Sequence, residues 1–457
     1  MVPRSDDTIA AIATPPGEGA ISVVRVSGPD ALKTADTIFR GRTTLAVAPG
    51  FSAHLGEIIH PSGGLLDQVI VTIFRSPHSY TGDDTAEISC HGGSYLTQRV
   101  LDALVSAGAR PAEPGEFTRR SFLNRKMDLT QAEAVADLIA SRTERAQRVS
   151  LEQLRGRLGD EIRQLRGNLV DLCSLVELEL DFVDEEIEIT SNKEIGEKLE
   201  LADGLLDSLV KSYQTGKLYR DGVSVAIAGP PNTGKSSIFN ALLEHDRAIV
   251  THVPGTTRDT LEESISIAGM LFRLTDTAGI RESSDLVEAE GIQRARRIIA
   301  DADIVLLVSD VSSPEGANTP LPAARNPAQR IVAVENKLDL LPSPPKILVS
   351  NDPARVCVSA KTGFGLDRLR SLLVWLVAAT GLPVDETHLV TRRRHRDALR
   401  RAQERLRLAI VGVEEKVSNE FVALDIRGAA ESLGEITGEV TSEEILNNIF
   451  SSFCIGK

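Results

Sequence analysis

The feature that most constrains this chain is a glycine-rich segment at residues 229–236, with the sequence GPPNTGKS. It matches the pattern GxxxxGK[ST], in which backbone N–H groups wrap a phosphate, the lysine reaches the outer phosphates and the hydroxyl binds magnesium. The apolar run 223–228 before it predicts a strand, and the run 237–243 after it predicts a helix. A strand, a phosphate loop and a helix in this order predict a nucleotide site in which Lys235 and Ser236 contact phosphate and metal.

The region from about 216 to 380 continues the same pattern. Apolar runs at 304–309, 331–335 and 356–359 alternate with helical segments, which is typical of a mostly parallel sheet covered by helices. The proline-rich stretch 313–329 is expected to be a surface loop. We therefore predict an α/β module of the P-loop class.

A second motif identifies the base. Asn336-Lys337-Leu338-Asp339 follows the run 331–335. A carboxylate at position 339 can accept two hydrogen bonds from the guanine N1–H and exocyclic amine, whereas adenine lacks this donor pair. Ser359-Ala360-Lys361, after the next run, would add a backbone N–H to the guanine carbonyl. These motifs, in this order, predict a GTP site and disfavour an ATPase.

Two segments between these motifs predict nucleotide-dependent switches. Gly255-Thr256-Thr257-Arg258-Asp259 offers a threonine hydroxyl to magnesium when the γ-phosphate is present. In Asp276-Thr277-Ala278-Gly279, Asp276 supports the metal shell and the Gly279 N–H can sense the γ-phosphate. We expect distinct GTP and GDP conformations.

The residue after the second switch segment is Ile280, where Ras-like enzymes carry a glutamine that orients the attacking water. An aliphatic side chain cannot do this, so either the GTPase is a poor catalyst or a later carboxylate takes the role. The residues alone leave four candidates open, each also compatible with a solvated helix face: Glu282, Asp285, Glu288 and Glu290.

The segments that flank the GTPase region differ from it in composition and in the pattern of their apolar residues. Residues 1–118 mix short β-rich runs with a helical stretch at 95–107, which predicts an α+β module. Residues 119–215 and 381–457 have helical composition, so we predict one helical domain interrupted by a GTPase domain at 216–380. A buried helix face is indicated by apolar residues at spacings of three and four, namely Ile162, Leu165, Leu169, Leu172 and Val176.

Composition bounds the compartment. Four cysteines form no CxxC pair, no apolar run reaches about 18 residues, and Asp6 and Asp7 stand where a signal peptide would be cationic. We expect a soluble cytoplasmic protein with no disulfide framework, structural zinc or membrane span.

A net charge of −14 means that a phosphate-bearing macromolecule would need a local basic patch. Two interpretations of the arginine-rich cluster near position 396 are open, a nucleic-acid patch or a solvated helix face with intramolecular ion pairs. The cluster consists of Arg392, Arg393, Arg394, His395, Arg396, Arg400 and Arg401.

The order of these modules, together with the C-terminal Cys454-Ile455-Gly456-Lys457, resembles the tRNA modification GTPase family called MnmE or TrmE. The resemblance covers essentially the whole chain. Further segments that look like the family's pattern are ATPPG at 13–17, YTG at 80–82, HGG at 91–93, PGEFT at 114–118 and LTQAEA at 129–134.

For the GTPase domain, the resemblance implies a homodimer whose G domains meet across their switches, with potassium in place of an arginine finger. Potassium contacts would come from Asn232, Thr251, the Val253 backbone and Thr256. Magnesium ligands would be Ser236 and Thr257, and the water-orienting glutamate falls on Glu288. Pro254, where the family usually has a small residue, departs from the pattern and removes a backbone N–H.

Together these interpretations predict an extended set of GTP-binding residues. The set is Asn232, Thr233, Gly234, Lys235, Ser236, Ser237, Thr251, Thr256, Thr257, Asp276, Thr277, Ala278, Gly279, Asn336, Lys337, Asp339, Ser359, Ala360 and Lys361.

For the N-terminal module, the resemblance implies a 5-formyl-tetrahydrofolate or related one-carbon donor. Its contacts would be Arg25, Glu87, Lys126 and the terminal Lys457. Cys454 is open to two interpretations, a buried small apolar residue or a catalytic reactive thiol beside the one-carbon unit.

The family works with an FAD-dependent partner in a hetero-oligomer. Together they add a carboxymethylaminomethyl group to carbon 5 of the wobble uridine of certain tRNAs. The alternative is a GTPase switch that regulates assembly, such as ribosome maturation. It would share every G-domain residue, but it has no need of Cys454, Lys457 and the N-terminal module.

Overall fold

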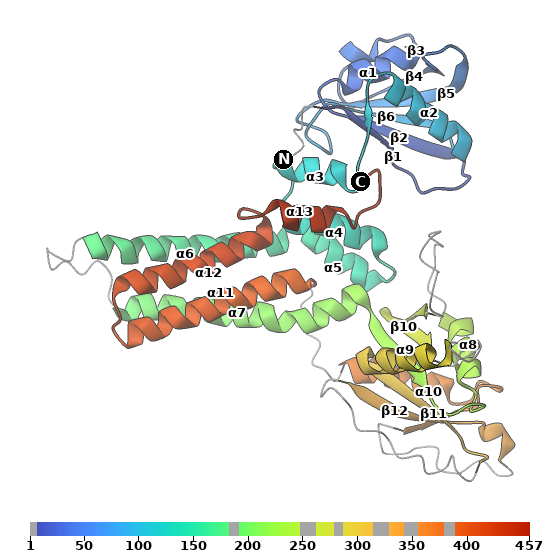
Figure 1. Cartoon of the computed structure of the whole chain (residues 1–457), viewed down its shortest axis with the longest axis vertical. Coiled ribbons are helices and arrows are strands. Elements are labelled where there is room, and N and C mark those ends of the chain that lie inside the picture. The colour runs from blue at the N-terminus through green and yellow to red at the C-terminus, as the bar shows by residue number, and fades with distance from the viewer. Residues whose placement is uncertain are drawn as a thin grey trace. The chain divides into compact units, whose positions relative to one another are not determined.

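The computed structural model describes residues 7–181, 192–246, 262–277, 287–313, 329–341, 355–378 and 389–457 (Figure 1). The chain divides into two compact units. The first comprises 1–136, 153–202 and 401–457, and the second comprises 137–152 and 203–400. The chain crosses between them several times, as expected for a domain inserted into a helical one.

The N-terminal module is built on a sheet with the strand order β3-β4-β5-β6-β2-β1-β7. Neighbours pair antiparallel except β1 and β7, which are parallel. The strands are β1 (Ile9–Ile12), β2 (Ile21–Ser27), β3 (Phe39–Gly41), β4 (Ser52–Ile59), β5 (Leu65–Phe74), β6 (Thr85–His91) and β7 (Arg110–Pro111).

Helices cover both sides of this sheet. α1 (Ala31–Ile38) and α2 (Ser94–Ser106) pack on one face, against Val24 and Val26 of β2. α3 (Glu116–Leu123) contributes Phe117, which packs against Ile9 and Ala11 of β1. Because side chains alternate across a strand, Phe117 lies on the face opposite α1 and α2, the face to which Arg25 also points.

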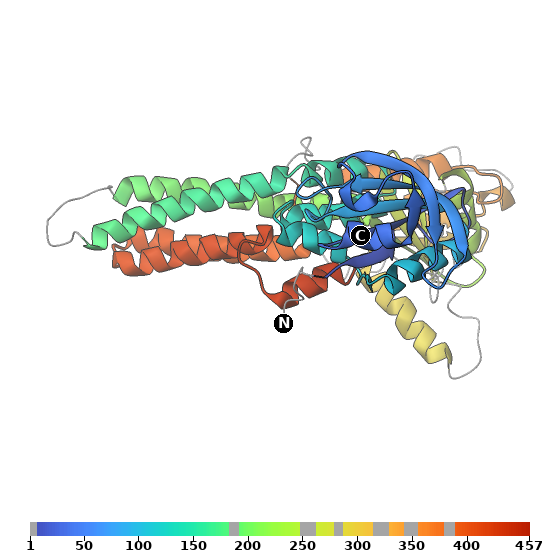
Figure 2. The same ribbon diagram turned by 90° about the horizontal axis from the view of Figure 1, so that it is seen from above.

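The helical part of the first unit contains the predicted apolar stripe. It lies on α6 (Arg157–Asp181), where all five stripe residues are buried. α6 packs along α12 (Asn419–Thr437), and the two run side by side in Figures 1 and 2. Helices from before and after the GTPase region therefore share one core, which confirms the interrupted helical domain.

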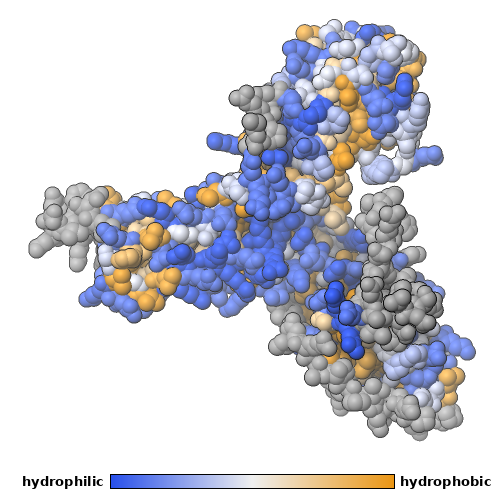
Figure 3. Space-filling view, viewed as in Figure 1, coloured by the Kyte–Doolittle hydropathy of each residue, from blue (hydrophilic) through white to orange (hydrophobic). Residues whose placement is uncertain are grey.

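The remaining helices are α4 (Leu129–Ala140), α5 (Glu144–Leu154), α7 (Asn192–Asp221), α11 (Arg393–Glu414) and α13 (Glu443–Phe450). α13 packs on the first turns of α4 through Leu446, Ile449 and Phe450. Exposed apolar side chains gather over α11 and α12, among them Leu408 and Phe421 (Figure 3).

The GTPase module is a second sheet with the order β13-β12-β11-β8-β10-β9, parallel except for β9 against β10. Its strands are β8 (Val223–Ala228), β9 (Glu262–Ile267), β10 (Met270–Asp276), β11 (Ile304–Asp310), β12 (Arg330–Asn336) and β13 (Arg355–Cys357). The accompanying helices are α8 (Lys235–Asp246), α9 (Val287–Asp301) and α10 (Leu366–Ala378), with the 3₁₀ turn η3 (Leu338–Leu340).

This sheet confirms the predicted mostly parallel architecture. Its core is mainly aliphatic, with Val225 and Ile227 of β8 in one cluster with Leu306 and Val334 of the other parallel strands. The phosphate loop leaves the carboxyl end of β8, the edge at which open α/β sheets bind ligands. Across the described ranges, no helix is both long and apolar enough to span a bilayer.

Candidate functional site

The phosphate loop joins β8 to α8 and depends on two glycines. Gly229 and Gly234 adopt φ of 147° and 91°. A Cβ at Gly229 would lie 2.2 Å from the Val308 carbonyl oxygen, and one at Gly234 would lie 2.2 Å from Asn336 Nδ2. Both positions therefore exclude any larger residue, because backbone strain and close neighbours act together.

Within the loop, the polar side chains are arranged for phosphate and metal. Lys235 Nζ donates a hydrogen bond to the Pro230 carbonyl oxygen at 2.8 Å. Ser236 Oγ lies 2.7 Å from Asp276 Oδ2 at the end of β10, so a hydroxyl and a carboxylate adjoin. These are the oxygen donors that Mg²⁺ prefers, so the residues fit a magnesium ion.

The guanine motif is tied to the phosphate loop through Asn336. Its Nδ2 donates to the Thr233 carbonyl oxygen, and its Oδ1 accepts the Ala360 N–H, both at 3.0 Å. Ser359 Oγ donates to Asp339 Oδ1 at 2.7 Å. The structure thus brings together three separate segments of sequence around one site.

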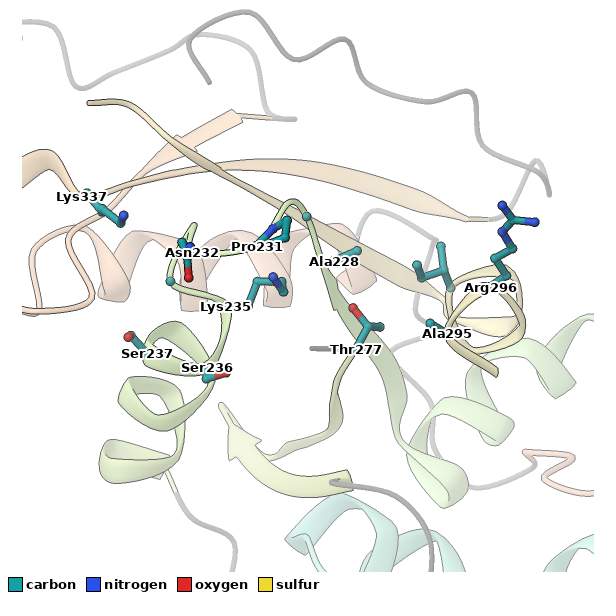
Figure 4. Close-up of a pocket in the computed structure, with 13 residues that line it drawn as sticks. Ala228, Pro231, Asn232, Lys235, Ser236, Ser237, Thr277, Ala295, Arg296 and Lys337 are labelled. Atoms are coloured by element: carbon teal, nitrogen blue, oxygen red, sulfur yellow. The ribbon is translucent and has the colours of Figure 1, made fainter. Parts of the chain in front are cut away.

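A pocket of about 850 Å³ is lined by the phosphate loop, the start of α8, one face of α9, Thr277 and Lys337 (Figure 4). Asn232, Lys235 and Ser236 come from the phosphate loop and the start of α8, whereas Ala295 and Arg296 come from α9. The described lining contains lysine and arginine but no carboxylate, which suits a polyanion. The lining residues are Ala228, Gly229, Pro231, Asn232, Gly234, Lys235, Ser236, Ser237, Thr277, Ala295, Arg296, Ile299 and Lys337.

Several predicted residues cannot be placed in this pocket. Glu288 and Glu290 belong to helix α9, but their side chains lie outside the described residues. The other predicted residues outside the described ranges are Thr251, Val253, Thr256, Thr257, Ala278, Gly279, Glu282 and Asp285, and most of the loop 313–329 is also outside them.

A second cluster of predicted residues lies on the N-terminal sheet. Arg25 of β2 stands opposite Glu87 of β6 in the strand register, and Arg25 Nη2 lies 2.7 Å from Glu87 Oε1. The guanidinium also lies over the rings of Tyr80 and Phe117, at 5.3 and 5.5 Å from their centroids. Such a cation is held by both an ion pair and two aromatic faces.

The C-terminal tail packs on this same module. The Phe117 N–H donates to the Lys457 carbonyl oxygen at 3.2 Å, and the Gly115 N–H lies 3.5 Å from the Cys454 carbonyl oxygen. Gly456, with φ of 95°, approaches β1 so closely that a Cβ would lie 2.2 Å from the Ile12 carbonyl oxygen. The tail is therefore part of the fold.

The docked tail places the Lys457 ammonium next to Arg25 and Glu87. Burial, followed by the positive charge of Arg25, lowers the pKa of Lys457, and the Glu87 carboxylate opposes this shift. Lys126 is exposed and donates to the Pro77 carbonyl oxygen at 3.0 Å, so it lies on the adjoining loop. Cys454 is exposed, which overturns its interpretation as a buried apolar residue.

Several side chains of the arginine cluster near position 396 form ion pairs within the chain. Arg392 contacts Asp137, and Arg396 contacts Asp397 while its guanidinium lies 4.7 Å from the Tyr213 ring centroid. Arg401 pairs with Glu435. The geometry favours a helix face with intramolecular ion pairs.

Comparisons with known proteins agree with this architecture. A family model described as "GTP-binding protein TrmE N-terminus" matches residues 8–126, and one described as "MnmE helical domain" matches 129–454. The tRNA modification GTPase MnmE of Chlorobium chlorochromatii (strain CaD3) is 44% identical over 466 residues, covering 99% of this chain and 98% of its own length. This chain belongs to the MnmE family.

Other MnmE relatives are similarly close. The tRNA modification GTPase MnmE of Salinibacter ruber (strain DSM 13855 / M31) is 43% identical and covers 99% of both chains. Among solved structures, the G domain of the T. maritima FeoB iron transporter is 25% identical over 34% of this chain and 98% of that one, with a TM-score of 0.23. An Era variant from Aquifex aeolicus is 24% identical over 40% and 67%, with a TM-score of 0.26.

In this MnmE family chain, sequence reasoning missed residues that support the motifs. Asp310, at the end of β11, lies 2.5 Å from Lys337 Nζ. Burial alone would raise the pKa of Asp310, but hydrogen bonds from Lys337 and Ser312 hold that pKa below its usual value. Asp310 ends an apolar strand at the carboxyl edge of the sheet, and that position could have identified it.

Proposed function

We propose that this chain is a potassium-stimulated GTPase that modifies the wobble uridine of certain tRNAs. With an FAD-dependent partner, it would add a carboxymethylaminomethyl group at carbon 5, taking a one-carbon unit from a formyl-tetrahydrofolate. The observation that carries this proposal is the docking of Lys457 beside Arg25 and Glu87. An assembly switch alone would have no need of it.

In the GTPase step, the residues of the pocket would hold and polarise the nucleotide. Lys235 would exchange its bond to Pro230 for the outer phosphates, and Asp339 would read guanine. Ser236, with Asp276 beside it, would hold magnesium, which supplies charge neutralisation at the phosphates. Asn232, in the phosphate loop, lines the pocket and would offer its amide oxygen to potassium, with Thr251, Val253 and Thr256 completing that site.

Glu288 would orient the attacking water, since Ile280 cannot. Thr257 would be the second magnesium ligand, and Gly279 would sense the γ-phosphate. Hydrolysis would serve as a conformational step, because no phosphate is expected in the modified base.

In the N-terminal module, three cations would bind the carboxylates of a folate, namely Arg25, Lys126 and Lys457. Glu87 holds the Arg25 guanidinium in place, and the Tyr80 and Phe117 rings give it a fixed apolar surround. Cys454, three residues before Lys457 in the tail, is exposed, and its thiol could reach a one-carbon unit bound at these cations.

The proposal includes a cytoplasmic homodimer that forms a hetero-oligomer with the flavoprotein. Domain limits are proposed at 1–118, 119–215, 216–380 and 381–457.

The deciding experiment measures modified nucleosides in tRNA from cells that lack this chain. We expect loss of the carbon-5 modification at wobble uridine, restored by the intact gene. Unchanged tRNA together with altered ribosome profiles would favour the assembly switch.

A further inference from the structure

One buried carboxylate holds both crossings of the chain between the GTPase module and the helices. Asp137 lies near the end of α4, and its side chain is 9% exposed. Its Oδ1 accepts hydrogen bonds from Arg220 Nε at 3.0 Å and Arg392 Nη2 at 2.7 Å. Arg220 is in the last turn of α7, just before β8, and Arg392 directly precedes α11.

The chain that returns from the GTPase module is also packed against α7. The Val390 N–H donates to Ser212 Oγ at 3.0 Å. Gly216 allows close approach, because a Cβ there would lie 2.2 Å from the Val390 carbonyl oxygen. Leu389 shares a buried cluster with Tyr219. The two crossings are thus joined to each other as well as to Asp137.

The turn between α4 and α5 contacts the GTPase sheet itself. Arg142 Nη1 donates to Ser264 Oγ on β9 at 3.0 Å. Next to it, the Arg145 guanidinium lies 5.7 Å from the Tyr219 ring centroid. β9 begins at Glu262, five residues after Thr257 in sequence. The strand that follows the first switch segment is therefore bonded to the same turn.

We propose that residues 137–145, which run from the last turn of α4 into the start of α5, transmit the nucleotide state of the GTPase module to the rest of helix α4. Asp137 and Arg142 are positioning residues in this role. A shift of β9 would move Arg142 through its hydrogen bond to Ser264. Asp137 would pass that movement on to α4, because separating this buried carboxylate from its two guanidinium partners is costly. α4 begins in the first unit and ends in the second, so it is shared by both.

The proposal rests on the proposed use of GTP hydrolysis as a conformational step, and its test needs neither tRNA nor the flavoprotein. Amide hydrogen exchange of residues 129–152 is compared in the full chain with GDP and with a non-hydrolysable GTP analogue. In the unmutated chain we expect rates to differ by about threefold or more between nucleotides, as a local opening equilibrium shifts. Asp137→Asn and Arg142→Ala should abolish that difference, with nucleotide affinities within about twofold of the unmutated chain.

Matched controls separate transmission from structure. Asp221→Asn removes a carboxylate that also contacts Arg220, at 3.5 Å, and should keep the nucleotide-dependent difference. Ser264→Ala should match Arg142→Ala, and the double variant should add nothing, as expected for one shared contact. Arg142 is exposed, so Arg142→Ala decides the question if Asp137→Asn fails to fold.

A difference that persists in folded Arg142→Ala and Asp137→Asn would overturn the proposal. So would an unmutated chain that binds both nucleotides yet shows no difference. Failure of the unmutated chain to bind GTP in a nucleotide titration would instead overturn the GTP site on which the proposal depends.

Discussion

The carboxylate expected to read guanine is oriented by a neighbouring hydroxyl. Ser359 Oγ donates to Asp339 Oδ1, and the Ser359 loop is joined to Asn336 through the Ala360 N–H. At the scale of single residues, specificity for guanine should therefore depend on the negative charge of Asp339 and on the hydrogen bond by which Ser359 orients that carboxylate.

Asp339→Asn should weaken GTP binding by about 2 kcal/mol, because charged hydrogen bonds to the base are lost. The variant should bind xanthosine triphosphate better than the unmutated chain, since xanthine carries an oxygen where guanine has its amine. Competition titrations with GTP, ATP and xanthosine triphosphate measure both effects. Ser359→Ala keeps the carboxylate and should lose only a few-fold in affinity with selectivity retained. Equal affinity of the unmutated chain for ATP and GTP would contradict the assignment.

Glu288→Ala should lower the turnover of GTP by about 10²-fold, the scale of removing a group that orients water. Nucleotide affinity should stay nearly unchanged, because Glu288 is assigned to the attacking water and not to the bound nucleotide. Steady-state rates in potassium and in sodium measure the effect, and the unmutated chain should be faster in potassium. Glu290→Ala is the control on the same helix. Normal turnover by Glu288→Ala would mean that another carboxylate acts.

At the scale of elements, the C-terminal tail, residues 454–457, follows α13 and packs on the N-terminal module. α13 is fixed on α4 by Leu446, Ile449 and Phe450, and the tail then bonds to Gly115 and Phe117. Terminal residues are poorly ordered unless tied down, and here backbone hydrogen bonds tie them. The docking of these four residues thus depends on the helices α13, α4 and α3 and on the close approach of Gly456 to β1.

Deleting residues 454–457 should abolish tRNA modification and weaken folate binding by tenfold or more, on the scale of a lost charge-assisted contact. GTP hydrolysis should remain within about twofold, because the GTPase pocket uses none of these residues. Folate titration and GTP turnover of the same preparation make the comparison. Cys454→Ser, which keeps the backbone contacts, should keep folate binding and reveal whether the thiol is needed. Full modification by the deleted chain would remove the tail from the mechanism.

At the scale of the whole molecule, an ion network of two buried and two partly exposed side chains joins Asp7, just before β1, to α3. Arg120, 4% exposed, lies 2.9 Å from Glu116 and 2.5 Å from Asp7, and Arg110 pairs with both carboxylates. Burial alone would raise the pKa values of Asp7 and Glu116, but hydrogen bonds from Arg110 and Arg120 hold both values below their usual range.

The network predicts a pH-dependent stability. A carboxyl with a depressed folded pKa stabilises the fold fully above its unfolded pKa, here 3.8 for Asp7 and 4.5 for Glu116, and less as pH falls through the folded value. Stability should therefore fall as pH drops below about 4.5. Arg120→Ala should cost about 3 kcal/mol at neutral pH, because a buried partner is lost. Urea unfolding at several pH values measures both. Exposed Arg42→Ala should change stability by less than about 0.5 kcal/mol, and an equal loss in the two variants would contradict the network's role.

The sequence alone determined the features that depend on neighbours in the chain. The GxxxxGK[ST] segment needs only local backbone geometry, so its place between β8 and α8 could be predicted, as could the buried stripe of α6. The motif order also indicated the family. These features could be predicted because glycine conformations, helical period and strand alternation are short-range properties.

Only the tertiary structure decided which distant groups meet. Asp137, Arg220 and Arg392 share no local pattern, and contacts across 83 and 255 residues of chain leave no periodic signal in the sequence. The same holds for the pairing of Lys337 with Asp310, for the ion pairs of the arginine cluster and for the tail against Phe117. Burial and charge become known for these groups only when the chain has folded, since both depend on what surrounds a side chain in space.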